Sequence, residues 1–166
     1  MAAGAKGFSS PLVRLDEAGL VRWGERVGET LRPPAVLALR GPLGTGKSVL
    51  ARAVGMGAGV RQAMPSPSFN LLFRYPTDRG CEVVHLDLYR LKSPDELWEL
   101  GWGELGSDQE IVLVEWPERA GDAMLTDRWV IELSVPPGKP EFRDVSVRRV
   151  GNPPELAAFP LSVSGA

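Results

Sequence analysis

The sequence predicts an α/β domain whose sheet mixes parallel and antiparallel strands. Two uninterrupted apolar runs, 35–39 and 111–114, are rich in Val, Leu and Ile, as expected for strands buried within a parallel sheet. An amphipathic helix is expected from residue 16 to about residue 31. Two further pairs of strand-like segments are joined by short turns, which favours antiparallel hairpins.

The first helix is expected to begin at Asp16, because a short side chain with an oxygen acceptor caps helix N-termini well. Its apolar stripe follows the i, i+3, i+7, i+11 spacing of a surface helix and consists of Leu20, Trp23, Val27 and Leu31. Pro33 and Pro34 end the helix and lead into the strand at 35–39.

Strands are then expected at 69–75 and 82–89, with the turn at 77–80 making them an antiparallel hairpin. A short helix follows. Ser93 is its expected N-cap, and Glu96 closes a capping box.

The run at 111–114 is expected to form a second buried strand. Segments 129–135 and 142–150 flank the Pro136-Pro137-Gly138 turn and predict a final hairpin.

The length of 166 residues corresponds to one domain. We expect a flexible tail at 1–11, the folded domain at 12–150, and a C-terminal tail of uncertain order at 151–166. A net charge of −2 disfavours a broad polyanion-binding surface, and the single cysteine, Cys81, fits a reducing compartment. No apolar run approaches membrane-spanning length, so a cytoplasmic protein without membrane contact is expected.

Residues 41–48 spell Gly-Pro-Leu-Gly-Thr-Gly-Lys-Ser, the G-x-x-x-x-G-K-[ST] pattern of a phosphate-binding P-loop. The run at 35–39 precedes it and a helix at 48–54 follows, which is the context that the motif requires. We expect the phosphates to be contacted by Leu43, Gly44, Thr45, Gly46, Lys47 and Ser48. Lys47 would reach the β- and γ-phosphates, while the Ser48 hydroxyl would coordinate Mg²⁺. The prediction is therefore a three-layer P-loop NTPase domain.

Two carboxylates could complete this site. Asp87 and Glu115 each follow a buried apolar run, at strand ends where such groups hold Mg²⁺ in P-loop enzymes. Either could hold a metal-bound water, and Glu115 could instead orient the attacking water as a general base. Both are candidate catalytic and metal-associated residues together with Lys47 and Ser48. Which of the two lies nearer the metal stays open, as does the alternative of solvent-facing carboxylates.

Other polar residues are less decisive. Ser66-Pro67-Ser68-Phe69 could form a loop whose hydroxyls meet Mg²⁺ or phosphate, or an ordinary turn. His85 is expected on the same strand face as Asp87, as a structural or a catalytic group. The chain has no Asn-Lys-x-Asp segment for reading guanine and no long arginine-bearing lid. A small-molecule kinase and a nucleotide-dependent binding module without hydrolysis remain the alternatives to an ATPase.

The whole constellation resembles the TsaE family, the P-loop ATPases of bacterial tRNA threonylcarbamoyladenosine biosynthesis. The resemblance spans about residues 12–150, in the family's order and spacing. The matching segments are Gly-Pro-Leu-Gly-Thr-Gly-Lys-Ser at 41–48, Ser-Pro-Ser-Phe at 66–69, His-Leu-Asp-Leu-Tyr-Arg-Leu at 85–91, Pro-Asp-Glu-Leu at 94–97 and Val-Glu-Trp-Pro-Glu-Arg at 114–119.

The resemblance implies an ATP- and Mg²⁺-dependent ATPase that works with a TsaB–TsaD-type complex and resets it, contacting tRNA only through that complex. It implies that Ser48 and Glu115 are associated with Mg²⁺ and that Asp87 is the Walker-B-like carboxylate. Ser68 would belong to a switch-like loop, and Lys139 would stand where the family often has an arginine near the nucleotide. Hydrolysis is expected to be slow without the partners.

Overall fold

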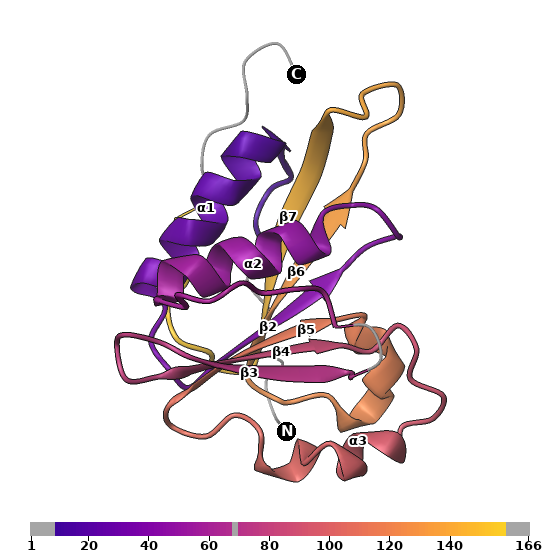
Figure 1. Cartoon of the computed structure of the whole chain (residues 1–166). Coiled ribbons are helices and arrows are strands. Elements are labelled where there is room, and N and C mark those ends of the chain that lie inside the picture. The colour runs from indigo at the N-terminus through magenta and orange to yellow at the C-terminus, as the bar shows by residue number, and fades with distance from the viewer. Residues whose placement is uncertain (1–8, 68–69, 159–166) are drawn as a thin grey trace, which may run out of the picture.

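A computed structural model describes residues 9–67 and 70–158 and contains one seven-stranded mixed sheet with helices on both faces (Figure 1). The strands, in chain order, are β1 (Val13–Asp16), β2 (Ala35–Arg40), β3 (Leu72–Pro76), β4 (Glu82–Asp87), β5 (Glu110–Glu115), β6 (Arg128–Ser134) and β7 (Phe142–Val150). The helices are α1 (Glu17–Thr30), α2 (Lys47–Ala58), α3 (Glu96–Glu99) and the 3₁₀ segments η1 (Trp102–Glu104) and η2 (Pro117–Ala123).

The strand order is β1-β7-β6-β2-β5-β4-β3. The four central strands, β6, β2, β5 and β4, run parallel, whereas the pairs β3–β4, β6–β7 and β1–β7 are antiparallel. The mixed sheet and both hairpins expected from the sequence are thus confirmed. Strand β2 lies between β5 and β6, which both come later in the chain. The segment that follows β2 therefore begins at a topological switch point of the sheet.

Helices α1 and α2 pack together on one face of the sheet, above it in Figure 1, and the segment containing α3 covers part of the other face. The first face buries the expected stripe of α1, Leu20, Trp23, Val27 and Leu31. On the second face, Leu97, Trp102 and Ala120 pack against alternate residues of β2, β4 and β5. Burial on both sides explains why these central strands read as unbroken apolar runs.

The start of α1 confirms the expected cap, because Asp16 Oδ1 accepts a hydrogen bond from the Gly19 N–H at 2.8 Å. The capping box at Ser93 is wrong: α3 begins after Asp95, which makes no side-chain cap, and Ser93 offers its carbonyl to the Glu96 N–H instead. Glu96 does fold back, but onto the N–H of Lys92. The proline at 94 allows a turn here before the helix starts.

Two elements were not anticipated. Strand β1 pairs with β7, and Ser9 forms a bridge with Arg148 ahead of it. The second unexpected element is η2, which follows β5 after a single residue, Trp116. Close to the C-terminal limit of the described residues, Trp129 Nε1 donates a hydrogen bond to the Pro154 carbonyl at 2.7 Å. The division of the chain into a domain and two tails stays a prediction.

Within residues 9–67 and 70–158, none of the helices has both the length and the apolar character needed to cross a membrane.

Candidate functional site

The loop between β2 and α2 contains three glycines with positive φ, Gly41, Gly44 and Gly46. At Gly41, with φ +145°, a Cβ would lie 2.3 Å from the Leu133 carbonyl oxygen of β6. Only glycine therefore allows the loop to leave β2 this close to the neighbouring strand. At Gly44 the surroundings are open, so the demand there is conformational alone.

Helix α2 begins at Lys47 with Gly46 as its N-cap, in the left-handed conformation. A glycine has no side-chain acceptor for the N–H groups of the first helical turn. These groups and the positive end of the helix dipole are consequently available to an anion. The glycine-rich sequence explains both the sharp turn and the uncapped helix start.

Lys47 is buried, with 5% of its surface exposed. Its Nζ donates to the carbonyl oxygens of Gly41 at 2.6 Å and Pro42 at 2.8 Å, and lies 4.3 Å from the centre of the Trp116 ring. Burial lowers the pKa of Lys47, while the nearby carboxylates, Glu115 first and then Asp87, act in the opposite direction. The ammonium group is held inside the loop by backbone carbonyls and an aromatic face.

Glu115 is the centre of a buried polar chain. Its Oε1 accepts from the Ser48 hydroxyl at 2.9 Å, and its Oε2 accepts from His85 Nε2 at 2.6 Å. His85 is fully buried and Glu115 is 2% exposed. His85 Nδ1 has no hydrogen-bond partner among the described residues. The carboxylate is fixed from two sides, by the first turn of α2 and by β4.

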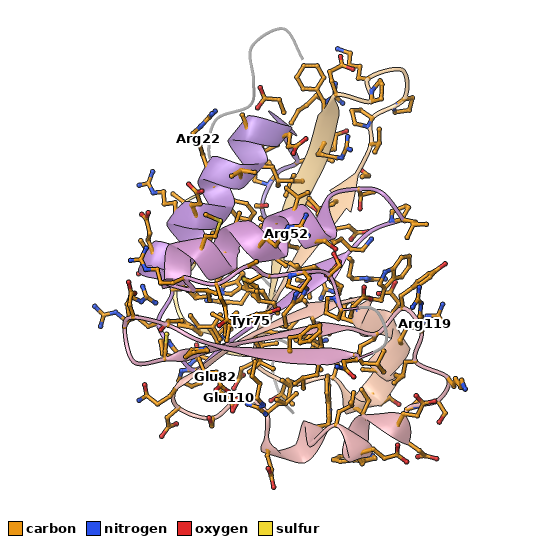
Figure 2. The ribbon with its side chains drawn as sticks, viewed as in Figure 1. Arg22, Arg52, Tyr75, Glu82, Glu110 and Arg119 are labelled. Carbon is orange, nitrogen blue, oxygen red and sulfur yellow. The ribbon has the colours of Figure 1, made fainter. Side chains whose placement is uncertain are left out.

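Asp87 lies beside Glu115, because β4 and β5 are parallel and the two residues are in register at the ends of these strands. The opposite ends of these two strands begin with Glu82 and Glu110, which Figure 2 shows together at the lower left. Arg119, which follows the end of β5, lies far from them on the right of that view. Burial raises the pKa of Asp87; the Tyr89 N–H, which donates to Oδ1 at 3.0 Å, opposes that shift.

A cavity of about 320 Å³ collects most of the residues expected to bind nucleotide and metal. It is lined by Leu43, Gly44, Gly46, Lys47, Ser48, Val49, Asp87, Tyr89, Glu115, Trp116 and Arg143. The Thr45 side chain is buried within the loop itself, where its hydroxyl donates to the Pro42 carbonyl. A larger cavity of about 390 Å³ lies elsewhere, between the end of α1 and residues 154–158, and shares none of these groups.

Two of the expected binding residues that the structure describes, Thr45 and Lys139, are not among the residues that line the 320 Å³ cavity. Lys139 lies in the β6–β7 turn, where its N–H donates to the Pro136 carbonyl, so a nucleotide contact from its side chain stays a prediction. Ser68 lies outside the described residues. Its neighbour Ser66 accepts a hydrogen bond from Arg52 of α2 at 3.3 Å.

Sequence reasoning missed Arg143, the second residue of β7, which lines the cavity and hydrogen-bonds to the loop. It also underrated Trp116, whose φ of +58° is the only positive value for a non-glycine residue in the described part of the chain. The Trp116 ring packs on Tyr89 at 4.9 Å between centroids. The Glu-Trp-Pro sequence was the one available signal, whereas nothing local in the sequence marks Arg143.

No three His, Cys, Asp or Glu side chains converge as a ready-made metal site anywhere in 9–67 or 70–158. A hydroxyl and one or two carboxylates nevertheless fit Mg²⁺, which keeps several waters and is held in part by substrate phosphates. Ser48, Glu115 and Asp87 supply such a donor set at the cavity.

The comparisons with known proteins agree with one another. A family model described as "Threonylcarbamoyl adenosine biosynthesis protein TsaE" matches residues 15–141. The chain is 31% identical over 114 residues to a protein of Treponema pallidum and 35% identical over 132 residues to one of Streptomyces coelicolor, both named "tRNA threonylcarbamoyladenosine biosynthesis protein TsaE". These matches cover 69% of this chain and 83% of the treponemal protein, and 77% of this chain and 88% of the streptomycete protein.

Matches to six other proteins with that name cover between 52% and 65% of their length. The fold is similar to that of the crystal structure of YdiB from Bacillus subtilis, with a TM-score of 0.68 at 19% sequence identity over 89% of this chain and 90% of that one. The family model spans both β2, with its glycine-rich loop, and the β4 and β5 carboxylates. The chain therefore belongs to the TsaE family of threonylcarbamoyladenosine biosynthesis proteins.

Proposed function

We propose that the protein binds ATP with Mg²⁺ in the cavity at the β2–α2 loop and hydrolyses it in support of tRNA threonylcarbamoyladenosine modification. One observation carries this proposal: Ser48, from the first turn of α2, is hydrogen-bonded to Glu115 from the end of β5, beside a buried Lys47. That combination joins a phosphate-binding loop to the acidic group that a Mg²⁺-dependent reaction needs.

The phosphates are bound by the loop amides and Lys47. The glycine cap leaves the first-turn N–H groups of α2 without a side-chain acceptor, and a polyphosphate would satisfy them. Lys47 already occupies the interior of the loop, held by the carbonyls of Gly41 and Pro42. A phosphate oxygen offers a stronger, charged acceptor, so the ammonium group moves toward it on binding.

Ser48 would hold Mg²⁺ through its hydroxyl oxygen, with Glu115 and Asp87 accepting hydrogen bonds from the metal's water shell. When bound, Mg²⁺ neutralises part of the negative charge on the β- and γ-phosphates. Glu115 orients the Ser48 hydroxyl by accepting its hydrogen bond through Oε1, which turns an oxygen lone pair toward the cavity. His85 holds the other carboxylate oxygen and keeps the group from rotating.

The two carboxylates have different tasks in this proposal. Glu115 has both oxygens engaged, one by Ser48 and one by His85, and therefore positions the metal-binding hydroxyl. Asp87 lines the cavity with its Oδ1 on the Tyr89 N–H. Because both oxygens of Glu115 are engaged and Asp87 lies at the cavity, we assign Asp87 to the water that attacks the γ-phosphate.

The partner is a TsaB–TsaD-type complex, with tRNA contacted only through it, and hydrolysis by the chain alone is slow. Family membership supports this, and so do the hydrogen bonds that already engage Arg143. Its guanidinium lines the cavity but donates to backbone carbonyls of the loop and the β6–β7 turn. A cationic group that stabilises the transferred phosphoryl is therefore expected from the partner.

The test is ATP turnover by the full chain, alone and with TsaB and TsaD, with Lys47→Ala as the matched variant. We expect low turnover alone, clear stimulation by the partners, and loss of ATP affinity in the variant by calorimetry. Equal turnover with and without the partners, or retained ATP binding by Lys47→Ala, would contradict the proposal. Phosphate transfer to a small acceptor would point to a kinase, and tight binding without hydrolysis to a binding module.

A further inference from the structure

Arg143 extends from β7 to the loop between β2 and α2, where it donates to two carbonyl oxygens. Nε is 2.9 Å from the Thr45 oxygen and Nη2 is 3.4 Å from the Gly44 oxygen. Its Nη1 donates to the carbonyls of Pro140 and Phe142, each at 2.7 Å. The guanidinium thus connects two segments almost a hundred residues apart in sequence.

Each of these two loop peptides includes a glycine. Thr45 is flanked by Gly44 and Gly46, both with positive φ, and glycine crosses between backbone regions at low cost. The Thr45 hydroxyl holds the Pro42 carbonyl and so fixes the side chain, but not the peptide planes on either side. A hydrogen bond from outside the loop can therefore select one orientation of these peptides.

Peptide geometry gives the contact its consequence. In a planar trans peptide, the C=O and N–H groups point in opposite directions. The Thr45 carbonyl shares its peptide with the Gly46 N–H, and the Gly44 carbonyl shares its peptide with the Thr45 N–H. By holding both carbonyls, Arg143 turns the N–H groups of Thr45 and Gly46 away from itself.

Lys47 makes the complementary contact. It holds the carbonyls of Gly41 and Pro42, the first two residues of the loop, from within. Two cationic side chains thereby divide four carbonyls of one short loop between them. A phosphate would draw Lys47 away from the carbonyls of Gly41 and Pro42. Arg143 has three further acceptors besides the Thr45 oxygen, so its movement would break more hydrogen bonds.

We propose that Arg143 is a positioning residue that sets the peptide orientation of the phosphate-binding loop, so that the Thr45 and Gly46 N–H groups face the phosphates. The proposal rests on the proposed nucleotide-binding function. The orienting effect depends on the forked geometry of the arginine donors and not on the positive charge. The hydrogen bonds to Pro140, in the β6–β7 turn, and to Phe142 hold the guanidinium in place.

The test uses three variants of the full chain. Arg143→Met keeps a long apolar stem without donors, and Arg143→Lys keeps the positive charge without the fork. Arg149→Met removes a charge from an exposed position on the same strand and is the control. Amide resonances of Gly44, Thr45 and Gly46 are followed by ¹H–¹⁵N NMR in the protein without nucleotide, and Mg–ATP affinity by calorimetry.

We expect both Arg143 variants to broaden or split the Thr45 and Gly46 resonances and to weaken Mg–ATP binding by about tenfold to a hundredfold, as for lost hydrogen bonds to a charged group. Arg149→Met should leave both readouts unchanged. The melting temperature of each variant identifies any general loss of folding, and Arg143→Lys supplies the result if Arg143→Met does not fold.

Parent-like affinity in Arg143→Lys would overturn the proposal, because charge alone would then suffice. Unchanged amide resonances in Arg143→Met would overturn it as well. If the parent chain itself failed to bind Mg–ATP, the proposed function would fall, while the amide spectra would still decide whether Arg143 orients the loop.

Discussion

The Ser48 hydroxyl donates to Glu115 Oε1 over 2.9 Å, and this contact joins the first turn of α2 to the end of β5. Serine and glutamate stand 67 positions apart, so only the parallel pairing of β2 with β5 brings them together. The contact fixes the direction in which the lone pairs of the Ser48 hydroxyl oxygen point.

Ser48→Ala should lower ATP turnover by about tenfold to a hundredfold, the usual cost of losing a group that orients or ligates a metal. Ser48→Thr retains the hydroxyl and should restore most of the activity. The measurement is turnover as a function of Mg²⁺ concentration with the partner complex present. An Ala variant with the parent's Mg²⁺ dependence would remove Ser48 from the metal site.

His85→Leu should destabilise the fold by about 1–3 kcal/mol, because Glu115 Oε2 would be left buried without its donor. Urea unfolding measures the change. In a chain that already carries Glu115→Gln, the same substitution should cost less, since a neutral amide is cheaper to bury than a carboxylate. An equal cost in both backgrounds would mean that packing, and not the hydrogen bond, is what His85 provides.

Asp87→Asn should abolish turnover and also change how stability depends on pH. The folded-state pKa of Asp87 is raised above 3.8, chiefly by burial, so the folded chain holds this proton more tightly than the unfolded chain. Folding stability from this group is therefore lost as pH rises from that value through the folded pKa, and the penalty persists at neutral pH.

The asparagine variant lacks that penalty. Relative to the parent, Asp87→Asn should gain stability in urea unfolding as the pH rises from 3.8 towards neutrality. Asp144→Asn, at a carboxylate paired with Arg14 on the far edge of the sheet, is a suitable comparison. If the difference between parent and Asp87→Asn were flat across that range, burial of the charge would not govern Asp87.

Two glycines in the loop should respond differently to alanine. Gly41→Ala should cost about 3 kcal/mol or more, because it adds left-handed strain to a clash with the Leu133 carbonyl. Gly44→Ala faces open space, so strain alone should cost about 1 kcal/mol. Thermal unfolding of the two variants measures the contrast, and similar losses at both positions would contradict the close approach at Gly41.

Most local signals in the sequence were sufficient, although the Ser93 capping box, an equally local signal, was wrong. The Asp16 cap, the apolar runs of β2 and β5 and the two hairpins depend on neighbours within a few positions, and all are found. His85 and Asp87 share a strand face because side chains alternate with a period of two. Their convergence with Glu115 required the parallel register of β4 and β5.

The features that the sequence did not predict depend on partners that are remote in sequence. Strand β1 has four residues and exists only because β7 offers it an edge. The role of Arg143 arises from the position of β7 beside the loop, and no pattern around residue 143 could show that. The left-handed Trp116 follows from the sharp exit of the chain from β5, where its ring packs on Tyr89 and covers Lys47.

The pairing of β1 with β7 joins residues about 130 positions apart, Val13 with Val145 and Asp16 with Phe142. Such distant contacts form late, since almost the whole chain must be present before the edge of the sheet can close. During synthesis the β2–α2 loop emerges long before Arg143 does. A nascent chain that ends before β7 would therefore carry the whole glycine motif, yet lack the strand that seals the sheet and the arginine that braces the loop.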